Sequence, residues 1–144
     1  MQKKVTVQVL GRQKYPEGQE DQQELSVSGT YYERKGVFYV VYKEPENTSG
    51  FEGVTTFLTL KKGSVTLNRK GAINSVQEFR VGFRNRCSYS TCYGKMWLSV
   101  LPQYVECDLT AQGGRISLEY DLFVDDNFVS HNLLLVTIKE DNPQ

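Results

Sequence analysis

The sequence contains one histidine, His131, and three cysteines, Cys87, Cys92 and Cys107, among its 144 residues. A structural zinc site takes four ligands, mostly Cys and His, and these cysteines form no Cys-x-x-Cys pair, so we expect no metal. An odd number of cysteines, behind an N-terminus that lacks a continuous apolar segment, is typical of free thiols. We expect no cofactor, and the sequence assigns the three cysteines no role.

The chain also lacks an excess of either charge and any long apolar run. Lysine plus arginine and aspartate plus glutamate number 17 each, so the formal net charge is zero. Proteins that bind nucleic acid or anionic membranes usually carry a basic excess, and no segment approaches the ~20 apolar residues of a membrane-spanning helix. We therefore expect a cytoplasmic protein with no membrane segment, and nucleic acid is disfavoured as a partner.

One local concentration of basic and aromatic residues departs from this balance. It comprises Arg80, Arg84, Arg86, Lys95, Tyr89, Tyr93 and Trp97. Cations beside stacking rings can bind single-stranded nucleic acid, but an ordinary solvated sheet face has the same composition. The zero net charge favours the second interpretation.

Alternation of apolar and polar residues with a period of two is the main pattern that is present. In residues 113–124 one parity carries Ile116, Leu118, Tyr120, Leu122 and Val124, which predicts a strand with one buried face. Asp and Asn at positions 125–127 tolerate the left-handed backbone of a tight turn. The apolar run over residues 128–138 then predicts the second strand of a hairpin, with Phe128 on the parity of Leu134, Val136 and Ile138.

The same pattern predicts about ten strands in the whole chain, and no window longer than about ten residues shows the helical period. Residues 11–24 and 44–53 are polar and are interpreted as loops, and Pro102 indicates a bend or an edge strand. Hairpin connections make neighbouring strands antiparallel, and closure of the sheet removes exposed edges. We predict an all-β fold: a single antiparallel up-and-down β-barrel of about 8–10 strands over residues 1–144. A two-sheet sandwich is the alternative, although cysteines clustered around Trp97 fit its immunoglobulin form poorly.

Several short segments, taken in order, resemble a known family. They are Gly29-Thr30-Tyr31-Tyr32, Val37-Phe38-Tyr39, Tyr42-Lys43-Glu44, Gly63-Ser64-Val65, Arg69-Lys70-Gly71-Ala72, Gln77-Glu78-Phe79, Val81-Gly82, Tyr93-Gly94, Gly113-Gly114-Arg115-Ile116-Ser117-Leu118, Tyr120-Asp121 and His131-Asn132. Over nearly its whole length the chain resembles the YwiB-like family of small uncharacterised Bacillus-type β-barrel proteins, which have a calycin-like or lipocalin-like fold. The resemblance implies a closed antiparallel barrel, no particular activity, and no role for the cysteines.

Five side chains are candidates for binding a ligand inside such a barrel. Arg69 lies on an apolar parity, where it is either an anchor for a carboxylate or phosphate or an arginine at the barrel mouth with its head in water. Gln77 lies on an apolar parity too, where it either contacts a ligand or forms a hydrogen bond with the backbone. We expect Arg69, Gln77 and Tyr93 together at the polar end of the ligand. Asn132, if inward, needs polar neighbours or a ligand. His131 falls on the opposite parity and is the single group that titrates near neutrality.

Three functions remain open from the sequence. The first is a non-enzymatic barrel that holds a small amphipathic or acidic ligand in its interior, which makes a small molecule the expected partner. The second is a protein-interaction scaffold with an outer aromatic face. The third is an enzyme that uses His131, which is disfavoured because no catalytic constellation can be placed around this residue. The ligand and the oligomeric state do not follow from the sequence.

Overall fold

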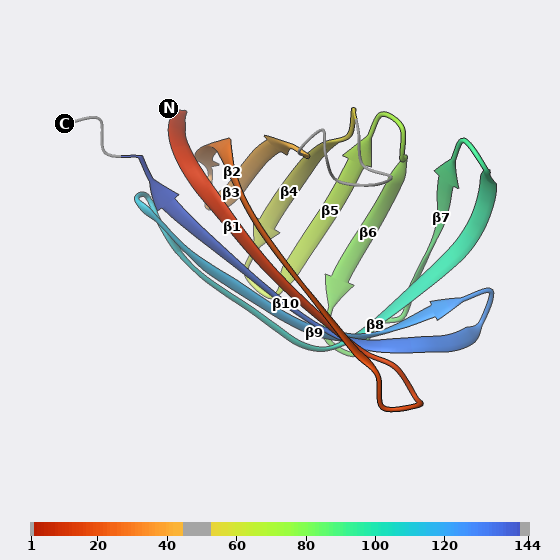
Figure 1. Cartoon of the computed structure of the whole chain (residues 1–144). Coiled ribbons are helices and arrows are strands. Elements are labelled where there is room, and N and C mark those ends of the chain that lie inside the picture. Colours follow the sequence, from red (N-terminus) through yellow and green to blue (C-terminus); the bar gives the residue numbers. More distant parts are fainter. Residues whose placement is uncertain (1, 45–52, 142–144) are drawn as a thin grey trace.

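The part of the chain that the structure describes folds into ten β-strands. A computed structural model describes residues 2–44 and 53–141 (Figure 1). The strands are β1 Lys3–Lys14, β2 Glu20–Arg34, β3 Val37–Lys43, β4 Thr55–Lys61, β5 Ser64–Lys70, β6 Ser75–Arg80, β7 Asn85–Thr91, β8 Gly94–Thr110, β9 Gly113–Val124 and β10 Asn127–Glu140. Within the described ranges there is no helix with the length and apolar character needed to cross a membrane.

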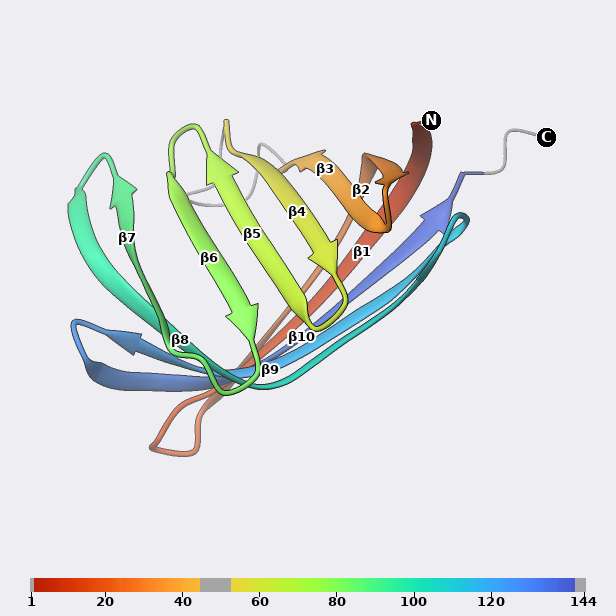
Figure 2. The ribbon, with the colours of Figure 1, turned by 180° about the vertical axis from the view of Figure 1, so that it is seen from behind.

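The ten strands form one antiparallel sheet that curls into a nearly closed barrel (Figures 1 and 2). Its order is β6-β5-β4-β3-β2-β1-β10-β9-β8-β7, so every neighbour is a hairpin partner except the pair formed by the first and last strands. Continuity of the sheet therefore depends on β1 and β10, whose register runs from Val5 opposite Glu140 to Lys14 opposite His131. The prediction of an all-β antiparallel meander is confirmed.

Two tight turns, one of them the turn predicted at residues 125–127, have left-handed backbone at both central residues. Lys35 and Gly36 have φ angles of 54° and 80°, and Asp125 and Asp126 have φ angles of 49° and 69°. Positive φ at both central residues matches the right-handed twist of the flanking strands, which favours Gly, Asn and Asp at these positions. These turns fix the register of β2 with β3 and of β9 with β10.

Alternate side chains of all the longer strands fill the barrel. The core includes Val5, Val7, Val40, Leu58, Leu60, Val65, Phe79, Val100, Ile116, Leu118, Val136 and Ile138. Tyr31 on β2 crosses this core, and its hydroxyl donates a 2.6 Å hydrogen bond to the carbonyl oxygen of Thr110 at the end of β8. Stacking of Tyr31 on Phe38, with ring centroids 5.7 Å apart, packs the same end of the barrel.

One expectation about the course of the chain was wrong, and a second held for one of its two alternatives. The segment 11–24 is a long polar hairpin rather than a loop: β1 continues to Lys14, and β2 begins at Glu20. Its polar composition reflects exposure on both faces, which is compatible with a strand pair that projects from the barrel. Pro102 lies inside β8, between β7 and β9, and is not on an edge. The expected bend is present as a register shift between Pro102 and Tyr104.

A bulge and the end of a strand leave apolar side chains on the outside. A bulge between Phe128 and Ser130 shifts the register of β10, so Phe128 is exposed while Leu134 and Val136 face the core. A bulge inserts one residue and exchanges the faces of the residues before it. Val81 and Phe83 have the parity of Gln77, but they follow the end of β6 at Arg80 and are exposed in the turn to β7. The predicted loop over residues 44–53 falls largely outside the described residues.

Candidate ligand-binding cavity

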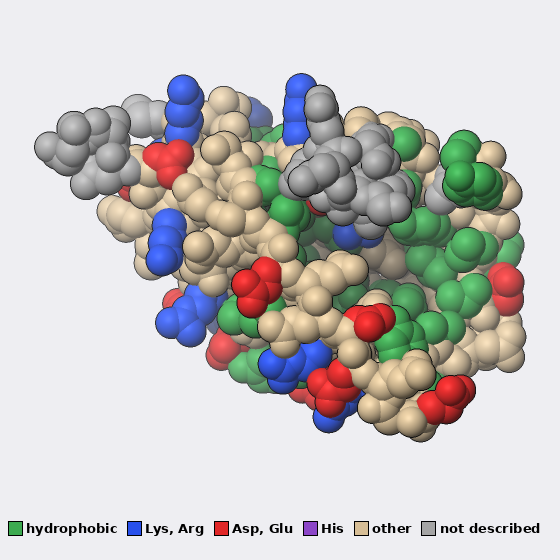
Figure 3. Space-filling model, in the orientation of Figure 1, with side chains coloured by type: hydrophobic (Ala, Val, Ile, Leu, Met, Phe, Trp, Pro, Cys, Tyr) green, Lys and Arg blue, Asp and Glu red, His purple; other side chains and the backbone are tan. Residues whose placement is uncertain are grey.

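A cavity of about 420 Å³ opens into the interior of the barrel. Its apolar walls include Met96, Leu98, Leu122 and Leu134, and its polar lining includes Arg69, Gln77, Tyr89, Tyr120 and Asn132. The β1–β2 hairpin contributes Gly11, Arg12, Gln13, Asp21 and Gln23 to the rim. Figure 3 shows the molecule hollowed on this side, with hydrophobic side chains along the right of the hollow. The volume lies in the range of small-molecule sites in proteins.

Three of the five candidate residues meet in this cavity. Arg69 comes from β5, Gln77 from β6 and Asn132 from β10. Gln77 lies opposite Leu67 in the sheet, and Asn132 lies opposite Tyr120. Both side chains are buried, as expected for polar residues on the inward parity of their strands.

The charge of Arg69 acts on two buried tyrosines. Burial raises the pKa of Tyr42 to about 12, and the nearby Glu44 adds to this rise, whereas Arg69 and a hydrogen bond with Thr56 oppose it. Burial likewise raises the pKa of Tyr120, and Arg69 opposes that rise. Both phenols stay protonated at neutral pH, so each can donate a hydrogen bond beside the guanidinium.

An acid also belongs to the surroundings of Arg69. Glu44 is buried, and its Oε2 accepts a 2.6 Å hydrogen bond from the hydroxyl of Thr56. Thr56 lies directly opposite Arg69 in the β4–β5 pair. Charged groups in an apolar interior need compensating partners, and Glu44 and Thr56 add a carboxylate and a hydroxyl to the surroundings of Arg69.

Asn132 has a local partner in the barrel wall. Its Nδ2 lies 3.1 Å from the hydroxyl oxygen of Ser130, and that oxygen lies 3.3 Å from Oδ1 of Asn132. Ser130 is buried and on the same strand face. The amide of Asn132 is thereby fixed in the wall, with part of its hydrogen-bonding capacity spent within β10.

His131 and Tyr93 do not reach the cavity. The Nδ1 of His131 is 2.7 Å from Oδ1 of Asp121, and its Nε2 is 2.8 Å from Oε2 of Glu119, on the outer face of β9 and β10. The hydrogen bond with Asp121 raises the pKa of His131 above its ordinary value, burial lowers it, and the bond with Glu119 adds to the rise. Tyr93 is 97% exposed in the β7–β8 turn, so its expected place at the polar end of the ligand is wrong.

Other polar residues around Arg69 were missed by the sequence analysis. The alternation pattern indicates Tyr120 only as a core residue, and it gives no signal for Glu44 or Thr56, because each is one polar residue in an ordinary context. Ser75 precedes Gln77 on the same parity and is buried, which is a signal that the alternation pattern does contain. The pairing of β4 with β5 that brings Thr56 to Arg69 could be read from the hairpin turn at residues 62–63.

The predicted concentration of basic and aromatic residues is divided by the barrel wall. Tyr89 lines the interior cavity, whereas Arg86 stacks over Trp97 with its guanidinium carbon 4.8 Å from the ring centroid. Arg84 lies 4.2 Å over the ring of Phe123 and forms an ion pair of 3.3 Å with Asp126. These arginines rest on aromatic faces, and the surface that they form with Trp97, Phe123 and Phe128 is called the arginine–aromatic surface below.

Comparison with known proteins identifies the family. A family model described as a domain of unknown function, DUF1934, matches residues 7–135. The chain belongs to the DUF1934 family. The uncharacterized beta-barrel protein YwiB of Bacillus subtilis (strain 168) is 28% identical to it over 110 residues, which are 76% of this chain and 75% of the relative. The crystal structure of ywiB protein from Bacillus subtilis matches 98% of this chain and 94% of that one with a TM-score of 0.87 and 23% sequence identity.

The predicted YwiB-like resemblance is therefore confirmed for this DUF1934 domain. The structural match, at 23% identity, shows a shared fold. Neither relative is described by an activity, so the assignment of function depends on the cavity and the surfaces of the chain itself.

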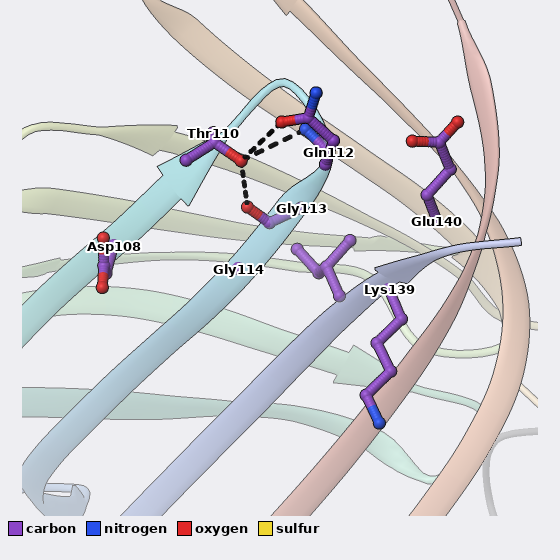
Figure 4. A pocket seen from close by; sticks show the side chains of 8 residues that line it. Asp108, Thr110, Gln112, Gly113, Gly114, Lys139 and Glu140 are labelled. Carbon is purple, nitrogen blue, oxygen red and sulfur yellow. Dashed lines mark hydrogen bonds between the residues drawn. The ribbon is translucent and has the colours of Figure 1, made fainter.

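A larger depression of this DUF1934 domain, about 720 Å³, lies on the outer surface at the β8–β9 turn (Figure 4). Its floor includes Gly113 and Gly114, and the hydroxyl of Thr110 forms a 3.2 Å hydrogen bond with the carbonyl oxygen of Gly113. A Cβ atom on Gly113 would collide with the carbonyl of Ile138. The depression is thus a consequence of glycines required by close strand pairing. Across the described part of the chain, no group of three or more metal-ligating side chains is present.

Proposed function

We propose that this domain binds a small amphipathic molecule with an acidic group inside the barrel. The observation that carries the proposal is the position of Arg69, a cation that lines an interior cavity with apolar walls and a polar rim, together with two buried amides, Gln77 and Asn132. Leu98, Leu122 and Leu134 would contact the apolar part of the ligand. Up-and-down barrels of this size can hold one small ligand, as lipocalins do, and a calycin-like mode of binding is part of the proposal.

Binding of decanoate and of decanol tests this function. Decanoate and decanol should both compete with a fluorescent fatty acid for the cavity. Decanoate should bind more tightly than decanol, because the guanidinium of Arg69 favours a carboxylate. A charge-assisted hydrogen bond contributes about 1.5–3 kcal/mol, so Arg69→Met is expected to weaken decanoate binding by about tenfold or more while decanol binding changes little.

Arg86→Met is the matched control, because Arg86 stacks on Trp97 outside the barrel. This variant should retain the affinity of the wild type for decanoate. Failure of both amphiphiles to compete at millimolar concentration, with the protein folded by circular dichroism, would refute the proposal.

The arginine–aromatic surface favours a second function, a protein-interaction scaffold. Trp97 and Phe128 are 43% and 45% exposed, and Phe123 packs against Phe128 edge to face at 5.8 Å. Aromatic residues and arginine are the side chains that most often dominate protein interfaces. Trp97→Ala should abolish capture of a protein partner under this function and leave decanoate binding unchanged.

The enzyme hypothesis has less support. Both ring nitrogens of His131 face carboxylate oxygens at hydrogen-bond distance, so neither nitrogen is open to a substrate in this arrangement. The imidazole is placed on the outer face, apart from the interior cavity.

A further inference from the structure

The wall of the barrel is incomplete between β6 and β7. These two strands are the ends of the sheet order, and they meet through one bridge, in which the backbone nitrogens and oxygens of Asn74 and Ser90 are 3.0 and 3.1 Å apart. Farther along, the backbone nitrogen of Glu78 donates to Oδ1 of Asn85 at 2.9 Å. Between these two points lies a slot of about 360 Å³ in the wall.

The slot is polar, and its charge is positive. Its lining includes Arg69, Lys70, Asn74, Ser75, Ser88 and Ser90. Within the described residues, no aspartate or glutamate lines it. Consecutive residues on a strand point to opposite faces, so Arg69 and Lys70 place one cation on the inner side of the wall and one on the outer side.

Ser75 provides an independent indication of a ligand. Its side chain is buried, with 5% of the residue exposed, and its Oγ has no hydrogen-bond partner among the described residues. Ser75 lies directly opposite Arg69 in the β5–β6 pair. Buried hydroxyls are normally hydrogen-bonded, and a group without a partner indicates a water, an ion or a ligand at that point.

We propose that the slot between β6 and β7 is an oxyanion site, in which the hydroxyl of Ser75 and the guanidinium of Arg69 bind a carboxylate or phosphate group. Both side chains donate hydrogen bonds, and arginine suits planar or tetrahedral oxyanions because its donors form a rigid fork. Lys70, on the outer side, attracts the anion from solution. The slot therefore gives the acidic group direct contact with solvent through the wall.

This site extends the proposed function, and the identity of its ligand as an amphiphile rests on that function. Arg69 lines both the interior cavity and the slot. A bound amphiphile would keep its apolar chain inside the barrel and place its acidic group in the slot, beside Ser75. The ligand class is therefore narrowed to alkyl carboxylates or alkyl phosphates whose headgroup is accessible from outside.

Titration of the isotope-labelled protein with inorganic phosphate tests the oxyanion site alone. The backbone amide signals of Ser75, Ser88 and Ser90 should shift together and saturate, and sodium chloride at equal ionic strength should not reproduce the effect. Ser75→Ala removes one hydrogen bond to a charged group and is expected to weaken phosphate binding about tenfold. Ser99→Ala, which changes a serine buried to 3% exposure on β8, should leave the affinity unchanged.

The titration separates this site from the cavity when decyl phosphate and decanol are added as further probes. Saturable phosphate binding without binding of either amphiphile supports the slot and refutes the interior cavity. Tighter binding of decyl phosphate than of decanol, with no phosphate shifts at Ser75 and no effect of Ser75→Ala on either affinity, overturns the slot and leaves the cavity proposal intact. The slot is also overturned if phosphate shifts the backbone amide signals of scattered surface lysines and Ser75→Ala leaves these shifts unchanged.

Discussion

Replacement of Tyr31 by phenylalanine tests how the packed end of the barrel is held. The variant keeps the ring that stacks on Phe38 and removes the hydroxyl, which donates a 2.6 Å hydrogen bond to the carbonyl oxygen of Thr110 across the core. Burial, with a smaller contribution from Glu33, raises the pKa of Tyr31 to about 12. The hydroxyl is therefore a donor at every pH at which the barrel would normally be studied.

The expected loss follows from the burial of this contact. Tyr31 is 1% exposed, and removal of one partner from a buried hydrogen bond costs about 1–3 kcal/mol. We expect a decrease of about 1.5–2 kcal/mol in the free energy of unfolding. At about 3–4 °C per kcal/mol for a chain of this length, this corresponds to a decrease of about 5–8 °C in Tm.

Urea unfolding followed by tyrosine and tryptophan fluorescence measures the change, with thermal unfolding as a second probe. Tyr32→Phe is the matched control, since Tyr32 stacks on Tyr39 with centroids 4.8 Å apart and is only partly buried. It should change the stability by less than about 0.5 kcal/mol. Equal stabilities of the Tyr31→Phe and Tyr32→Phe variants would refute the assignment of a stabilising role to the hydroxyl.

Three further perturbations follow from contacts described above. Because the pKa of His131 is raised in the folded state, the stability contributed by its charged form is complete below the ordinary value of 6.5 and is lost as the pH rises through the folded pKa. His131→Gln should therefore lower the free energy of unfolding more at pH 6 than at pH 9, and a pH-independent difference in urea unfolding would contradict this. Gly113→Ala should cost about 2–3 kcal/mol because its φ is +129° and a carbonyl of β10 occupies the place of the Cβ, whereas Gly63→Ala, with φ +77° and open space, should cost about 1 kcal/mol; equal costs would argue against the close approach. Iodoacetamide at pH 8 should modify the exposed Cys92 well before Cys107, whose pKa burial raises to about 11, and mass spectrometry of peptides would expose a reversed order.

The parity of the residues placed Arg69 and Gln77 on apolar faces, but it left open which of the neighbours His131 and Asn132 faces inward. Asn132 and His131 are neighbours, so a strand must send one into the barrel and the other out, and the structure places Asn132 inside. Arg69 and Gln77 followed the same rule. Prediction was reliable here because one buried face fixes the register of a strand.

Contacts that depend on irregular backbone or on distant pairing were not predictable in this way. The bulge after Phe128 changes the face of one ring without a marked change in composition. The bond from Tyr31 to Thr110 joins residues 79 positions apart, and no local pattern specifies such a partner. The unpartnered hydroxyl of Ser75 depends on where β7 ends relative to β6, which the alternation of residues leaves undetermined.

The pairing of β1 with β10 has a consequence for synthesis of the protein on the ribosome. All other ladders can form as hairpins while the chain emerges, but β1 must wait for a partner more than 110 residues later. During that interval the hydrogen-bonding groups along one side of β1 have no strand to receive them, and unpaired strand edges of this kind favour association between chains. Nascent chains that stall before Asn127 should therefore be the species that depends most on chaperones, and the arrival of the final strand ends that exposure.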